Sequence, residues 1–334
     1  MKIRSLNLSV LCIFLILNLF VPLALADEPV GSPASDLRRL QRFHAGRQVP
    51  GLGWYINEDY VPKSVAALLT RVKHAMRDQI VEAMEHDVDA AVTAEAMQAA
   101  VARRFAQAGL KIRRDDDGLY FGRVFLTRSA EVSGHPYLRA VTLVIGIPTG
   151  DDTSLYLFSR GPSGWKLVLS SEFNGYRRVD RAQSGLRYAV SPPAADGSWF
   201  VVTSSINNHV ASSWQQVTYA ALSPGDDPEH PRTLAWGHHG IFLAGYEDEQ
   251  KAYQLGVEAE GFSISLPFDF AADRPGAMWA TVGYGITSGV AQRRTRVCRL
   301  KGPRGRVIPC SIARGAVLAK QLRAQKESAV NERD

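Results

Sequence analysis

Four side chains that can bind metal or move protons recur at every fourth position: His74, Asp78, Glu82 and His86. On a helix, such residues share one face and drift by about 40° per step. Histidines and carboxylates at this spacing can hold zinc or iron. Residues 82–86, Glu-Ala-Met-Glu-His, differ only at their first position from a His-x-x-Glu-His zinc motif, and no third ligand is evident. A solvated helix face is the competing interpretation, favoured because amphipathic helices carry such residues outward.

A second candidate is the segment Trp-Gly-His-His-Gly at residues 236–240. Its glycines would let a ligand approach closely, and its imidazoles can act as acid, base or ligand. Consecutive strand residues point to opposite faces, so at most one of His238 and His239 can face a given pocket. No carboxylate partner can be assigned to either histidine from the sequence. Structural or surface roles are therefore favoured over catalysis.

Other catalytic patterns are weak or missing. Ser163 and Lys166 have the Ser-x-x-Lys spacing of some acyltransferases but fall in a Gly-Pro turn, which favours chance. The sequence holds no Gly-x-Ser-x-Gly elbow, phosphate-binding loop or dinucleotide fingerprint. Residues 115–118, Asp-Asp-Asp-Gly, lack the spacing of a calcium loop and predict a polar turn. We therefore predict no cofactor.

Tryptophans are the remaining candidate binding residues. Five of them fall after residue 110: Trp165, Trp199, Trp214, Trp236 and Trp279. An exposed Trp on a sheet commonly stacks on a sugar ring or anchors a protein partner. Burial in a β core is the more frequent role.

Helices are predicted before residue 110. A short helix fits 36–45, with Ser35 as N-cap and Gly46 as stop. A longer one, 62–86, carries apolar residues at i, i+3, i+4 and i+7, and a third, 93–108, ends at Gly109. The latter two are expected to pack as an antiparallel pair.

Alternating patterns and regular turn signals predict antiparallel strands from residue 110 onward. The expected strands are 119–127, 137–147, 154–159, 165–171, 186–191, 199–206, 215–222, 233–236, 262–268, 278–284 and 294–300, with turns at 116–118, 161–164 and 196–197. Residues 165–171 and 199–205 echo one another in Trp, Val, Ser and Ser. Residues 191–199 also resemble the Ser-Pro-Asp-Gly turn of periplasmic β-propeller repeats, although this segment is two residues longer than that turn. A sandwich or long meander explains the echo equally well.

The first 26 residues predict a cleavable export signal. Lys2 and Arg4 precede an apolar run from 6 to 25, and Ala24 and Ala26 place cleavage after Ala26. An uncleaved anchor is the alternative, but Asn18 and Pro22 interrupt the run. Lipidation at Cys12 is disfavoured by the bulky residue before it. The mature chain contains no further stretch long enough to predict a transmembrane segment.

Export leaves two cysteines, Cys298 and Cys310, which an oxidising compartment would join in a disulfide. Residues 295–300 and 306–310 are predicted to be the arms of a hairpin around the turn-rich segment 301–305. Two free thiols in a less oxidising setting are the alternative.

The formal charge of +6 is unevenly spread. Twelve Lys or Arg and three Asp or Glu lie between Arg293 and Asp334, so the preceding mature chain is net negative. A basic end could dock on an anionic envelope polymer or an unidentified protein, although a solvated edge is the favoured interpretation. Export argues against nucleic acid as the partner.

Together these patterns predict an α+β protein with an N-terminal helical hairpin and a large antiparallel β domain, irregular and propeller-like or a sandwich. The expected divisions are a signal peptide at 1–26, a leader with a short helix at 27–61, a helical pair at 62–109, a β-rich domain at 110–312 and a basic tail or short helix at 313–334. We expect a secreted or periplasmic, non-catalytic binding protein. The alternative is a secreted hydrolase, metal-assisted or not, that uses His238, His239 or the stripe from His74 to His86.

Overall fold

The computed structural model describes residues 31–42, 63–89, 92–110, 125–147, 150–172, 183–207, 214–242, 253–267, 278–287, 290–300 and 307–308. The predicted signal peptide with its site after Ala26, the turn at 116–118, Cys310 and the tail at 313–334 lie outside these residues. Among the described residues, no helix combines the length and apolar character needed to cross a membrane.

Three helices precede the sheets: α2 (Pro33–Gln41), α3 (Lys63–His86) and α4 (Ala94–Gln107). Thr93 caps α4, and Gly109 follows its end with φ +70°, a conformation that glycine adopts at no steric cost. The predicted cap of the first helix is wrong. Ser32, not Ser35, is the N-cap of α2, because proline at position 33 fits the first helical turn.

The strands form three antiparallel sheets. Sheet A contains β1 (Phe125–Val132), β2 (His135–Ile147), β3 (Gly150–Gly161) and β4 (Gly164–Ser171). Sheet B contains β5 (Gln183–Val190), β6 (Val201–Asn207), β7 (Trp214–Ser223) and β8 (Arg232–Phe242). Sheet C contains β9 (Gln254–Glu258), β10 (Gly261–Pro267), β11 (Met278–Thr287), β12 (Val290–Leu300) and β13 (Val307–Ile308).

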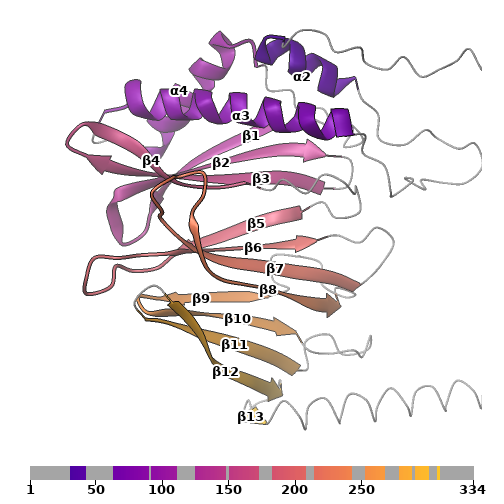
Figure 1. Cartoon of the computed structure of the whole chain (residues 1–334), viewed down its shortest axis with the longest axis vertical. Coiled ribbons are helices and arrows are strands. Elements are labelled where there is room, and N and C mark those ends of the chain that lie inside the picture. The colour runs from indigo at the N-terminus through magenta and orange to yellow at the C-terminus, as the bar shows by residue number, and fades with distance from the viewer. Residues whose placement is uncertain are drawn as a thin grey trace, which may run out of the picture.

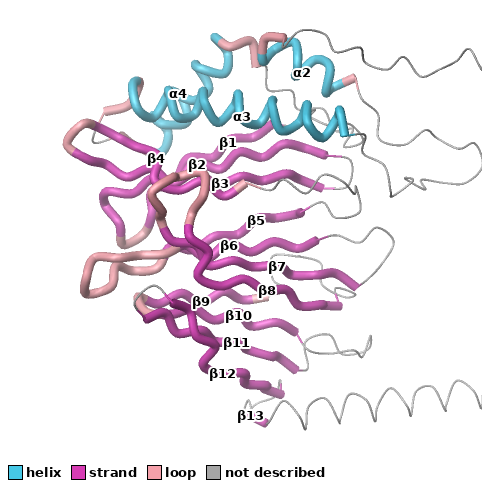
Figure 2. Tube along the Cα trace, viewed as in Figure 1, coloured by secondary structure: helices cyan, strands magenta, loops and turns pink. Residues whose placement is uncertain are grey.

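The helices and sheets form successive layers (Figures 1 and 2). The apolar faces of the helices pack on the outer face of sheet A, in a cluster that includes Met76, Phe105 and Phe158. The opposite face of sheet A packs on sheet B through residues such as Leu155 and Leu157. Sheet B in turn packs on sheet C through a further cluster that contains Phe262. Sheet B therefore has a neighbouring sheet on each face.

The predicted α+β, β-rich class and the antiparallel strands are confirmed. Gly164 (φ +103°) and Gly197 (φ +78°) lie in two of the predicted turns. Strand β9 was not predicted. The hairpin near the C-terminus is present, since β12 pairs with β13, and Cys298 stands opposite Ile308 in its register.

Candidate functional site

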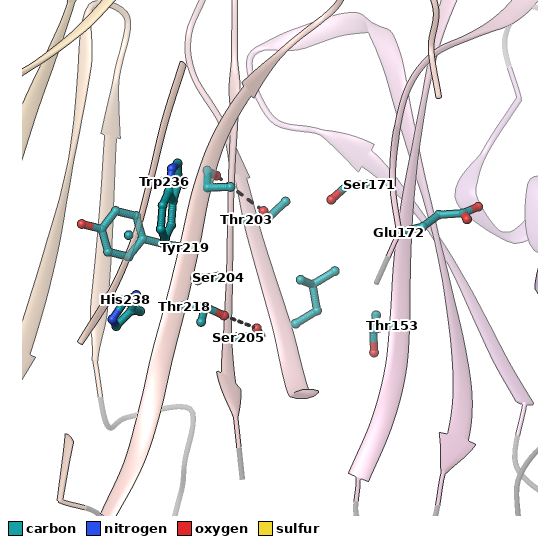
Figure 3. A pocket seen from close by; sticks show the side chains of 13 residues that line it. Thr153, Ser171, Glu172, Thr203, Ser204, Ser205, Thr218, Tyr219, Trp236 and His238 are labelled. Carbon is teal, nitrogen blue, oxygen red and sulfur yellow. Dashed lines mark hydrogen bonds between the residues drawn. The ribbon is translucent and has the colours of Figure 1, made fainter. Parts of the chain in front are cut away.

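A pocket of about 220 Å³ lies between sheets A and B. Most of the side chains around it carry hydroxyl groups. The lining residues are Thr153, Ser171, Glu172, Leu186, Thr203, Ser204, Ser205, Thr218, Tyr219, Ala220, Trp236, Gly237 and His238. Figure 3 shows the pocket from close by, with Thr153 and Ser171 on sheet A and the Thr203–Ser205 segment on sheet B. We call this space the inter-sheet pocket.

The pocket arises because the interface between the two sheets changes character along the strands. On β6, Val201 packs against sheet A, and Thr203 and Ser205 follow on the same face by strand alternation. On β7, Leu222 packs in the same apolar cluster and Thr218 lies on its face. Short hydroxyl side chains fill less volume than branched apolar ones, so this end of the interface stays open. Ser205 and Thr218 are hydrogen-bonded across the strands at 3.0 Å.

Trp236 and His238 form the rim of the pocket, on the edge strand β8. They pair with Ala220 and Thr218 of β7, which places their side chains on the pocket face of sheet B. Their rings are stacked, with centroids 6.1 Å apart, and Trp236 is 71% exposed. Between them, Gly237 leaves room for the Tyr219 ring, which crosses to sheet C and bonds the Tyr284 hydroxyl at 2.7 Å. An exposed aromatic ring beside a polar cavity offers an apolar face against which a ligand can pack.

Glu172 lines the pocket, but its carboxylate points away from the cavity toward the helices (Figure 3). There it accepts a hydrogen bond from the Tyr156 hydroxyl at 2.9 Å and lies 3.4 Å from His74 Nε2 and 3.9 Å from Arg77 Nη1. Burial and then the charge of Glu172 raise the pKa of the Tyr156 phenol well above its ordinary value. The phenol therefore stays protonated and keeps donating. This carboxylate holds the scaffold in place and does not reach a ligand in the pocket.

The β7–β8 connection is bound to the same part of sheet A. The Ser170 N–H donates to the Pro228 carbonyl at 2.7 Å, and Arg77 Nη1 lies 2.7 Å from Glu229 Oε2. Burial opposes the charge of Arg77, but the carboxylates around it outweigh this and raise its pKa. Because β8 begins directly after this connection, the contacts position the strand that carries Trp236.

The structure separates the residues that the sequence singled out. On the predicted metal stripe, the side chains of Glu82 and His86 are about half exposed, and only His74 reaches toward the pocket wall, through Glu172. Among the residues that the structure describes, no group of three or more His, Cys, Asp or Glu could hold a metal ion. His238 lines the pocket, whereas the side chain of His239 lies outside what is described. Lys166 pairs with Glu85 at 2.8 Å, and Ser163 is an exposed residue of the turn between β3 and β4.

The tryptophans divide as well. Trp165 is buried and donates its indole N–H to the Asp89 carbonyl at 3.1 Å, and Trp199 packs edge-on against His135. The side chains of Trp214 and Trp279 are not among those described. Trp236 is thus the described tryptophan that fits the binding interpretation.

The hydroxyl cluster was not predicted from the sequence, although a signal for it was present. The echo between 165–171 and 199–205 ends in Ser-Ser both times, and its last members, Ser171 and Ser205, both line the pocket from opposite sheets. No protein-family model, curated protein or solved structure matches this chain significantly.

Proposed function

We propose that this chain is an exported, non-catalytic binding protein that holds a saccharide in the inter-sheet pocket. The observation that carries the proposal is the combination of a hydroxyl-lined cavity with the exposed ring of Trp236 at its rim. Serine and threonine hydroxyls both donate and accept hydrogen bonds, as sugar hydroxyls do, and an aromatic face packs against the C–H face of a sugar ring. A few convergent polar groups in a concave site are what ligand orientation requires.

The arrangement of the charged groups supports binding over hydrolysis. A glycosidase of the usual kind needs two carboxyl groups on either side of the bond that it cleaves. The carboxylate of Glu172, the one acidic residue among the described lining residues, is turned away from the cavity and accepts a hydrogen bond from Tyr156.

For the predicted β domain, we propose the sandwich form. The face-to-face contacts of sheet A with sheet B and of sheet B with sheet C support it.

Export through residues 1–26 places the proposed ligand in the periplasm or outside the cell, where envelope saccharides occur. The basic segment from Arg293 onward, of which β12 and β13 are described, is proposed to hold the protein on an anionic envelope polymer. This attachment would weaken as salt concentration rises.

The test is saturation-transfer NMR on the mature chain with glucose, galactose, N-acetylglucosamine and their β-linked disaccharides. We expect transfer from the protein to at least one sugar, and at least a tenfold loss of affinity in Trp236→Ala. Tyr137→Ala is the matched control, because Tyr137 is an exposed aromatic residue of β2 that does not line the pocket. Absence of transfer to every sugar at millimolar concentration overturns the proposal. Cleavage of a disaccharide during the experiment overturns the non-catalytic part and favours the hydrolase.

A further inference from the structure

We propose that the inter-sheet pocket prefers amino sugars and neutral sugars to acidic sugars, because Asp151 presents a negative charge to it. This selectivity rests on the proposed saccharide-binding function. Asp151 is not itself one of the lining residues, so the selectivity can be wrong even if the pocket does bind saccharides.

Strand alternation gives the position of Asp151. On β3, the register with β2 is regular from residue 150 to residue 159, so Asp151, Thr153 and Leu155 share one face. Leu155 packs against sheet B, and Thr153 lines the pocket. The carboxylate of Asp151 therefore projects into the space between the sheets, on the same face as Thr153 and two residues before it along β3.

The neighbouring carboxylate has a different environment. Asp152 points to the other face of β3, where its Oδ2 lies 3.3 Å from Lys73 Nζ in a fully buried pair. None of the described residues forms a salt bridge of this kind with Asp151, which is only partly buried. Burial raises the pKa of the Asp151 carboxyl. This direction is the one expected for a carboxylate that is partly removed from water and has no neighbouring cation to stabilise its charge.

The surroundings reinforce the negative charge. No lysine or arginine occurs among the described residues that line the pocket. Behind the wall, the guanidinium of Arg77 is shared by three carboxylates: Asp78, Glu172 and Glu229. The three carboxylates outweigh the single positive charge of Arg77, so Arg77 adds no net positive charge near the pocket.

Ligand chemistry follows from this charge distribution. The carboxylate of a uronic acid would be repelled by Asp151 in a partly desolvated site, where charges are weakly screened. A protonated sugar amine would instead form a charge-assisted hydrogen bond with the carboxylate. A neutral sugar would gain only ordinary hydrogen bonds from the hydroxyl groups.

The test compares sugars that differ at a single substituent. Affinities of the mature chain are measured for glucosamine, glucose and glucuronate, and for galactosamine, galactose and galacturonate. We expect the amino sugar to bind most tightly in the series that binds, and the acidic sugar at least tenfold more weakly than the neutral one. In Asp151→Asn the difference between neutral and acidic sugar should fall to less than threefold.

Glu258→Gln is the matched control, because it removes an exposed carboxylate from β9 of sheet C and should leave the preference unchanged. Thermal unfolding checks that Asp151→Asn folds, and a neutral amide at a partly buried position should not lower the melting temperature. Equal affinity for the three sugars of a series, or unchanged preference in Asp151→Asn, overturns the selectivity alone. Absence of binding by all six sugars overturns the selectivity, and it overturns the proposed function as well when the saturation-transfer experiment also detects no bound sugar.

Discussion

Lys73 Nζ lies 3.3 Å from Asp152 Oδ2, and both side chains are fully buried. The pair joins α3 to β3, the strand whose opposite face carries Thr153 at the pocket. A displacement of α3 would therefore be transmitted directly to the pocket wall, since adjacent strand residues point to opposite faces.

Lys73→Met should destabilise the protein by about 3–5 kcal/mol, because a buried carboxylate loses its main counter-charge. The double variant Lys73→Met/Asp152→Leu should recover much of this loss, since no charge is then left buried. Urea unfolding of the wild type and of both variants measures the difference. A single variant that costs less than about 1 kcal/mol would show that the pair is not buried as described.

Tyr156→Phe should cost about 1.5–3 kcal/mol, the usual contribution of a hydrogen bond to a charged group. The phenol donates at 2.9 Å to Glu172, whose side chain is 8% exposed, so little water can replace it. Chemical denaturation gives the free energy of unfolding. Tyr188→Phe, on β5, is the comparison, and equal losses in the two variants would contradict a special role for the Tyr156 bond.

Acid should remove the contribution of the pair between Asp87 and Arg104. Arg104 donates to the two oxygens of Asp87 at 2.6 and 2.7 Å, and this hydrogen bonding lowers the pKa of Asp87 below its ordinary value of 3.8. Since the folded-state pKa lies below the unfolded-state pKa, the stabilisation is present above about pH 4 and is lost as the pH falls through the folded-state value.

Asp87→Asn should therefore lower the melting temperature at pH 7 and leave it nearly unchanged at pH 2. Both residues lie at the surface, so the effect should also shrink at high salt. A deficit that persists undiminished at pH 2 would assign the loss to something other than ionisation of Asp87.

Gly237→Ala should destabilise the edge of sheet B by about 1–3 kcal/mol, as overpacking does. An added Cβ would fall 2.6 Å from Cζ of Tyr219, so the ring or the strand must move. Thermal unfolding measures the loss. The adjacent variant His238→Ala, at an exposed position, should cost less than about 0.5 kcal/mol. Similar stability of the two variants would be inconsistent with the close packing at Gly237.

The disulfide between Cys298 and Cys310 stays a prediction. We expect the exported chain to be lighter than its reduced form by two hydrogens, and to give, after alkylation and digestion without reduction, one cross-linked peptide that a thiol reductant separates. The register places Cys298 opposite Ile308, and Cys310 lies outside the described residues. Full alkylation of both thiols without reduction would rule the bond out.

Much of the secondary structure could be predicted because local patterns specify it. The apolar period of α3 located its bounds to within one residue, and alternation with turn residues located β4 equally well. Strand β9 was missed because it is only five residues long and has Gly256 at its centre. Such a short segment contains too few alternating residues to show a strand pattern. The cap of α2 was misplaced because Ser32 and Ser35 are both good N-cap residues, and proline at position 33 decides between them.

The amino-acid sequence was enough to predict the order of helices and strands, the basic C-terminal segment and the export signal, since each depends on neighbours along the chain. Which faces of the sheets pack together became clear only from the folded chain. In the sequence Thr203 and Ser205 are ordinary strand residues, and only the packing of sheet A against sheet B makes them part of a pocket. Trp165 and Trp236 both lie on edge strands, but Trp165 is buried in the cluster with the helices and Trp236 is exposed. A pocket is made by surfaces distant in sequence, so the repeated Ser-Ser that supplies Ser171 and Ser205 could not show by itself that the two segments face one another.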